Sequence, residues 1–143
     1  MATGSLPAAA DRGPAEIEHI GSLPHNIEAE QQLLGAILTN NDIFERIVAI
    51  VRAEHFFDPV HGRIFAAAAQ RIQKGALASP VTLKAFLEGD EGLRLLGGPG
   101  YLARLAGGAI STYAARDYAQ LVRDLSLRRE LVGLGRDIAD RAA

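Results

Sequence analysis

The sequence lacks cysteine, and this absence excludes a disulfide framework and thiolate metal sites. It has no apolar run of signal-peptide length, and no stretch approaches the ~18 apolar residues that a membrane span needs. Strand patterns are missing too, because two-residue alternation never persists and β-branched residues are few. These absences predict an all-α protein without a membrane segment, and we expect it in the cytoplasm.

The sequence also lacks a basic excess. Its formal net charge is −2, its only lysines are Lys74 and Lys84, and its arginines are scattered among acidic residues. Proteins that hold nucleic acid through phosphates usually show a basic excess on at least one face. Composition therefore predicts little or no DNA binding by this chain itself.

The length and composition are sufficient for one domain with its own core. The chain has 143 residues, and 48% of them are hydrophobic. Residues 1–22, rich in Ala, Gly, Pro and Ser, are predicted to form a disordered tail. We expect residues 23–110 to form a compact orthogonal bundle of about five to six helices, and residues 111–143 to form a long helix.

Three helices are predicted from their starting residues. Asn26 is a good N-cap after a proline, and Asp58-Pro59 and Ser79-Pro80 each place a cap before a proline at the first helical position. We expect these helices to end near Asn40, at Lys74-Gly75 and at Gly89. Apolar residues at helical spacing then predict three buried faces: Ile27, Leu33, Leu34, Ile37 and Leu38; Val60, Ile64, Phe65, Ala68 and Ile72; and Leu83, Phe86 and Leu87.

Two further segments have weaker patterns. A helix is predicted to start at Asn41 and Asp42, and its apolar residues are Ile43, Phe44, Ile47, Val48 and Val51. The glycine-rich stretch 92–108 is predicted to hold one small helix around residues 101–105.

The stretch 112–143 contains no proline and predicts one long helix, which could bend at Gly133 or Gly135. Its apolar stripe changes face near Ser126. One side carries Tyr118, Leu121, Val122 and Leu125, and the other, about 180° away, carries Leu127, Leu131, Leu134 and Ile138. A helix whose stripe changes face needs two partners. We expect the first stripe to close the head and the second to contact another subunit or a later segment. The alternative is a break near Ser126, after which the helix folds back on the head.

No catalytic or nucleotide motif is present. The sequence has no phosphate-binding Gly-x-x-x-x-Gly-Lys-Ser/Thr string and no Gly-x-Ser-x-Gly elbow, and Gly97-Gly98-Pro99-Gly100 is better explained as a turn. The histidines lack His-x-x-x-His spacing, and they are His19, His25, His55 and His61. We therefore predict no catalytic, cofactor or metal site, and a packing or hydrogen-bonding role for His55 and His61.

Several polar and aromatic residues have ordinary structural explanations. Glu28 and Glu30 lie where a helix dipole favours acidic groups, which explains them better than a catalytic pair does. Arg128-Arg129 is better explained as a solvated helix face than as a phosphate contact. Four aromatic residues are expected in the core or at a seam: Phe56, Phe57, Tyr101 and Tyr113.

Five strings in one order, spread from Leu23 to about Ala139, resemble the N-terminal domain of DnaB-type replicative DNA helicases. The strings are Pro24-His25-Asn26-Ile27-Glu28-Ala29-Glu30 with Leu33-Leu34-Gly35; Phe56-Phe57-Asp58-Pro59-Val60-His61 with Ile64-Phe65; Val81-Thr82-Leu83; Gly97-Gly98 with Tyr101-Leu102; and Tyr118-Ala119 with Val122-Arg123 and Leu127-Arg128-Arg129. Ser79-Pro80 departs from the family's usual acidic cap and apolar residue, but it starts a helix equally well.

The resemblance implies a helical head followed by the first arm of a hairpin that pairs two subunits, with three pairs in a hexameric ring. It implies docking of a DnaG-type primase, at residues that these strings do not assign. It places ATP and Mg in a motor domain absent from this chain, single-stranded DNA in the ring of the whole protein, and the protein at the bacterial nucleoid.

Two alternatives stay open at this point. One is the related helicase-binding domain of a primase, which would follow a catalytic region, whereas Met1 and the loose tail favour a true start. The other is an unrelated helical DNA-binding domain, against which the net charge argues.

Overall fold

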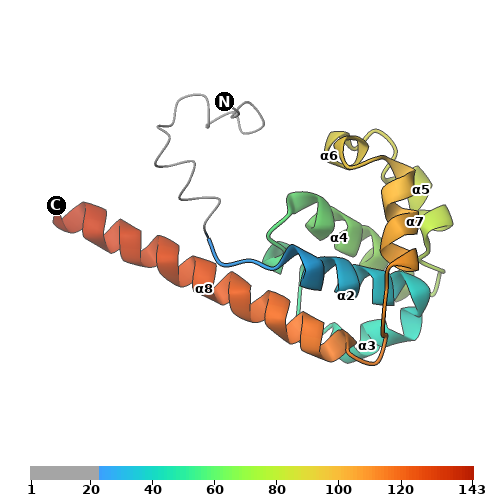
Figure 1. Cartoon of the computed structure of the whole chain (residues 1–143), viewed down its shortest axis with the longest axis horizontal. Coiled ribbons are helices and arrows are strands. Elements are labelled where there is room, and N and C mark those ends of the chain that lie inside the picture. Colours follow the sequence, from blue (N-terminus) through green and yellow to red (C-terminus); the bar gives the residue numbers. More distant parts are fainter. Residues whose placement is uncertain (1–22) are drawn as a thin grey trace. The chain divides into compact units, whose positions relative to one another are not determined.

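The computed structural model describes residues 23–143, so the predicted tail at residues 1–22 lies outside the described part. All regular structure among the described residues is helical, as expected. Figure 1 shows the elements: α2 (Ile27–Thr39), η2 (Asn41–Ile43), α3 (Phe44–Ile47), η3 (Ala53–His55), α4 (Pro59–Gln73), α5 (Pro80–Phe86), α6 (Glu91–Leu95), α7 (Pro99–Gly107) and α8 (Ala115–Ala142). Residues His25–Leu127 form one compact unit, called the head here, and Arg128–Ala143 belong to a second.

The predicted helix starts are confirmed by their hydrogen bonds. The Asn26 side chain accepts from the backbone N–H of Ala29 at 2.9 Å, at the start of α2. Asp58 does the same for Val60 at 2.9 Å before α4, and the Ser79 hydroxyl accepts from the backbone N–H three residues later before α5. The local chemistry of the caps therefore determines where these helices begin.

The shorter elements differ from the expectation. The helix predicted after Asn41 is a 3₁₀ turn followed by a single α-helical turn that ends at Ile47, and Val51 is buried outside it. A five-residue helix, α6, also lies in the glycine-rich stretch where only α7 was expected, and Asp90 caps it. Such a short helix shows too little of the 3.6-residue period for its pattern to be recognised.

The core of the head is built around α2, which packs against both α4 and α7. The approach of α7 is close, because a Cβ atom on Gly35 of α2 would overlap the carbonyl oxygen of Leu105. The large apolar side chains that are fully buried come from six helices and the link after α3: Leu33, Leu34, Ile37, Ile47, Val51, Ile64, Leu83, Leu102 and Val122.

The helix α8 continues through Ser126, Gly133 and Gly135, so the alternative of a break near Ser126 is wrong. Its buried residues are Ala115, Ala119, Val122 and Ser126. Leu121, predicted on this face, is 37% exposed. Three of the four buried residues of α8 are therefore small.

Two aromatic residues are more exposed than predicted. Phe86, predicted in the buried face of α5, is 55% exposed, and its ring lies 5.2 Å from the Arg71 guanidinium instead. Tyr113, expected in the core or at a seam, is 93% exposed in the link before α8. None of the described helices combines the length and the apolar character that a bilayer crossing demands.

Candidate interaction surface

Three polar side chains meet inside the head. Glu30 of α2, His61 of α4 and Tyr101 of α7 are 2%, 0% and 7% exposed. His61 Nδ1 lies 2.8 Å from Glu30 Oε1, and His61 Nε2 lies 2.6 Å from the Tyr101 hydroxyl oxygen. Because a carboxylate can only accept, Nδ1 carries a proton and donates a hydrogen bond to Glu30; in a neutral imidazole, Nε2 then accepts from the hydroxyl.

Glu30 and Tyr101 of this buried network make further hydrogen bonds. Glu30 accepts from the backbone N–H groups of Phe57 at 2.6 Å and Asp58 at 3.3 Å. The Gln31 amide donates to the Tyr101 hydroxyl at 3.2 Å. Burial raises the pKa of Tyr101, so the hydroxyl stays protonated and can donate. Buried polar groups that are fully bonded in this way hold their elements in one arrangement.

The buried network is structural. His61 is fully buried, so a substrate cannot reach it, and the network connects three helices. The prediction that His61 has a hydrogen-bonding role and Tyr101 a core position is therefore confirmed. Both Glu28 and Glu30 lie in the first turn of α2, as the dipole explanation expects, but for Glu30 that explanation is incomplete, because its carboxylate is also buried and hydrogen-bonded. The burial of Glu30 could have been predicted from the sequence, because Glu30 precedes Leu33 and Leu34 by one helical turn and so lies within the apolar stripe of α2.

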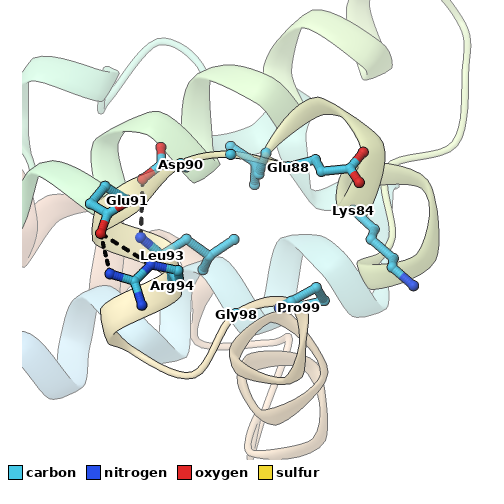
Figure 2. A pocket seen from close by; sticks show the side chains of 10 residues that line it. Lys84, Glu88, Asp90, Glu91, Leu93, Arg94, Gly98 and Pro99 are labelled. Carbon is cyan, nitrogen blue, oxygen red and sulfur yellow. Dashed lines mark hydrogen bonds and ion pairs between the residues drawn. The ribbon is translucent and has the colours of Figure 1, made fainter.

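A hollow of about 300 Å³ lies between the end of α5, α6 and the start of α7 (Figure 2). Leu87 and Leu93 are its buried residues. On its rim, Glu91 and Arg94 form an ion pair, and Asp90 accepts from the Leu93 amide. These rim groups therefore already satisfy part of one another's charge and bonding capacity.

Asp90 in this rim has a strongly shifted pKa. Its carboxylate accepts two hydrogen bonds from Arg63, at 2.7 and 3.0 Å, and it also caps α6. The bonds from Arg63 lower the pKa of Asp90 to about 2, and bonding to the Leu93 amide adds to the effect. The ion pair ties α4 to α6 and has a structural role.

The residues predicted for an oligomer interface are all exposed on α8. Their exposed fractions are 45% for Leu127, 66% for Leu131, 58% for Leu134 and 61% for Ile138. Spacings of four, three and four residues place them on one side of the helix. We call these four residues the apolar stripe of α8.

The remaining histidines and the paired arginines have ordinary contacts. His55 Nδ1 accepts from the Arg52 backbone N–H at 2.9 Å, and the ring of His25 stacks on Phe57. Within residues 23–143, no group of three or more histidine or acidic residues could hold a metal ion. Arg128 and Arg129 were predicted on a solvated helix face. Arg129 is only partly exposed, and its guanidinium donates to the Pro24 carbonyl at 2.8 Å.

Among the described residues, the head is all-helical, its buried polar network is closed to solvent, and the apolar stripe of α8 is exposed. The chain belongs to the DnaB-like helicase N terminal domain family, whose model matches residues 22–124. The resemblance seen in the five strings is thereby confirmed, and the alternatives of a primase domain and an unrelated DNA-binding domain are not supported.

The chain is also similar in sequence to individual replicative DNA helicases. The chain is 39% identical over 120 residues to the replicative DNA helicase DnaB of Rickettsia prowazekii, and 31% identical over 119 residues to that of Treponema pallidum. These matches cover 84% and 83% of this chain, but only 25% and 27% of the two relatives. The chain therefore spans about a quarter of the length of these relatives.

A solved structure shows the same fold. The crystal structure of the N-terminal domain of DnaB helicase from Mycobacterium tuberculosis matches with a TM-score of 0.77 and 29% identity. The match covers 83% of this chain and 86% of that one.

Proposed function

We propose that this chain is the oligomerisation and primase-docking domain of a hexameric replicative DNA helicase. Family membership and relatives named as replicative helicases support this proposal. In it, pairs of subunits associate through the hairpin that α8 begins, and three pairs form the ring of the whole protein. Single-stranded DNA passes through that ring, in the bacterial cytoplasm at the nucleoid.

The apolar stripe of α8 is the observation that carries the proposal. Burial of each of its four large side chains against a partner would contribute roughly 1.5–3 kcal/mol. A helix covered on one side and apolar on the other is what a shared interface requires. A second copy of the chain supplies the same stripe, and two equal stripes can cover each other in a symmetric pair.

The test places an aspartate in the stripe of the whole protein. We expect Leu131→Asp to weaken assembly, measured by sedimentation, because a charge cannot be buried at the interface without a partner. Helicity, measured by circular dichroism, should not change. The control is Arg136→Asp, which lies five positions along α8 and about 140° around it. Equal loss of assembly in both variants, or loss of helicity with Leu131→Asp, would contradict the proposed interface.

Primase docking rests on the resemblance, and its contact residues are unassigned. The direct measurement is calorimetric titration of the chain with the carboxy-terminal domain of a DnaG-type primase. Saturable binding supports docking by this domain. If no heat of binding is detected at high concentration, primase docking is contradicted.

The proposal gives this chain no catalytic role. ATP and Mg act in the motor domain of the whole protein. In the proposed division, residues 23–110 are the globular part and residues 111–143 the first hairpin arm, whose residues up to Leu127 also belong to the compact head. The chain alone should show no ATP hydrolysis above background, whereas the whole protein should. Hydrolysis by the chain alone would contradict this division of roles.

A further inference from the structure

Four arginines from two distant stretches of the sequence line two hollows of the head. Arg46 of α3 and Arg116 of α8 line a hollow of about 320 Å³. Arg52 and Arg123 line a second hollow of about 280 Å³, together with His55. Both hollows lie between the α3 region and the N-terminal half of α8, which Figure 1 shows beside each other. We call the two hollows together the arginine groove.

Three of these arginines have no partner within the described part of the chain. No ion pair or hydrogen bond engages the exposed guanidinium groups of Arg46, Arg116 or Arg123. Arg52 pairs with Glu54 at 3.0 Å, but both side chains are mostly exposed, and such pairs are weak. The head's other arginines each bond an acid or a backbone carbonyl: Arg63, Arg71, Arg94 and Arg104.

The spacing and the local charge favour an extended anion. Arg116 and Arg123 are seven residues apart on α8, which places them on the same side of the helix and about 10 Å apart along its axis. The lining of the two hollows holds four arginines and one acid, Asp117. Further acids flank it in the sequence, Asp42, Glu45 and Asp124, and Glu54 pairs with Arg52. The lining itself is therefore basic although the whole chain has a net charge of −2.

An exposed aromatic ring lies in the same groove. Tyr113 lines the hollow that contains Arg46 and Arg116, and it is 93% exposed. A large ring held in water beside unpaired guanidinium groups is the combination that single-stranded nucleic acid uses, with phosphates on the cations and a base on the ring. An acidic protein segment would use the cations but would not need the ring.

We propose that the arginine groove binds single-stranded nucleic acid through Arg46, Arg116 and Arg123, with Tyr113 as a stacking surface. This goes beyond the proposed function, which places DNA in the ring of the whole protein and not on the head. The net charge of the sequence predicted little DNA binding, but folding gathers basic residues that the sequence leaves scattered.

The first test measures binding of a labelled oligothymidylate of about 16 nucleotides to the chain by fluorescence anisotropy. We expect binding at low salt that weakens as salt rises. The double variant Arg46→Gln/Arg123→Gln should reduce affinity at least tenfold and lower the salt slope by about 1.4, since each phosphate contact contributes about 0.7 for a single strand.

The matched control is Lys74→Gln/Lys84→Gln, which removes the same charge from two exposed side chains outside the groove. It should leave the affinity within about twofold, since these lysines do not line the groove. Equal loss in both double variants, or no binding by the unmodified chain at low salt, overturns the proposal.

The second test examines the ring and the class of partner. Tyr113→Ala should weaken binding about fivefold or more, because stacking of one base is lost. Ile110→Ala, an exposed apolar residue in the same link, should not change it. Equal affinity of Tyr113→Ala and the unmodified chain overturns the stacking role. Polyglutamate that competes as well as the oligonucleotide shows that the groove takes an acidic protein, which also overturns the proposal.

Discussion

The hydroxyl of Tyr101 has two bonding partners inside the head, and both matter to its neighbours. It donates to the fully buried His61 and accepts from Gln31. The imidazole nitrogen that accepts this bond has no access to water, because His61 is 0% exposed. Loss of the hydroxyl would therefore leave a buried acceptor without a partner.

We predict that Tyr101→Phe lowers the free energy of unfolding by about 1–3 kcal/mol. Urea unfolding followed by circular dichroism measures this change. Tyr113→Phe removes the same hydroxyl from a ring that is 93% exposed, and it should have no effect. Equal stabilities of Tyr101→Phe and the unmodified chain would show that the buried network is unimportant for stability.

The stability difference between the unmodified chain and Tyr101→Phe should depend on pH. Burial raises the pKa of Tyr101 above its ordinary value of 10.0. The protonated hydroxyl therefore contributes stability below about pH 10, and this contribution is lost as pH rises through the higher pKa of the folded state. The stability difference between the unmodified chain and Tyr101→Phe should shrink above about pH 10, and a difference that stays constant would contradict the assignment.

The Asp90 carboxylate predicts a change of stability in acid. Its pKa falls from 3.8 to about 2 in the folded chain, chiefly through the hydrogen bonds from Arg63. The contribution is present above about pH 4 and is lost as pH falls through about 2. Because Arg63 is 49% exposed, solvent screening reduces the contribution, and we expect about 1 kcal/mol.

Asp90→Asn keeps a capping oxygen for α6 but removes the charge. It should be less stable than the unmodified chain near neutral pH, and the two should converge near pH 2 in urea unfolding measurements. Glu91→Gln, which changes only an ion pair on the surface, is the control. A stability gap for Asp90→Asn that persists at pH 2 would place its cause in the cap.

At the scale of elements, the close approach of α2 and α7 predicts opposite effects of one substitution at two positions. Gly35→Ala would place a Cβ on the Leu105 carbonyl oxygen, which is backbone and cannot move aside. We expect a loss of about 1–3 kcal/mol from this overpacking. Gly133→Ala meets nothing within 4 Å in α8 and should gain about 0.5–1 kcal/mol from helix propensity. Thermal unfolding of both variants measures this contrast, and the same sign for both would contradict it.

At the scale of the whole molecule, the apolar stripe of α8 predicts that stability depends on concentration. Association that requires the folded chain raises the thermal midpoint with protein concentration. We expect this rise for the unmodified chain in scanning calorimetry, and its disappearance in Leu131→Asp/Leu134→Asp. A midpoint independent of concentration in the unmodified chain would show that the stripe alone does not hold a pair together.

The element boundaries that could be predicted are those with local causes. Asn26, Asp58 and Ser79 bond amides two or three residues ahead of themselves, so their role is visible in the sequence. The all-α class follows from periodicity in the same way. The α6 helix and the shortness of α3 were missed, because a single turn has no period to detect.

Burial of individual side chains was less predictable, because it depends on residues far away in the chain. Glu28 and Glu30 are alike in sequence, yet only Glu30 meets His61, 31 positions later. Leu121 and Phe86 fit their stripes and are nevertheless exposed, because a stripe does not specify how wide its partner is.

Residue order alone established the helix starts, the all-helical class and the family, since each depends on neighbours within a few positions or on strings read in sequence. The tertiary structure determines which carboxylate is buried. It also places four arginines in the two hollows of the arginine groove: Arg46, Arg52, Arg116 and Arg123. Contacts of this kind join positions as far apart as Pro24 and Arg129, 105 residues along the sequence, and folding brings such positions within reach.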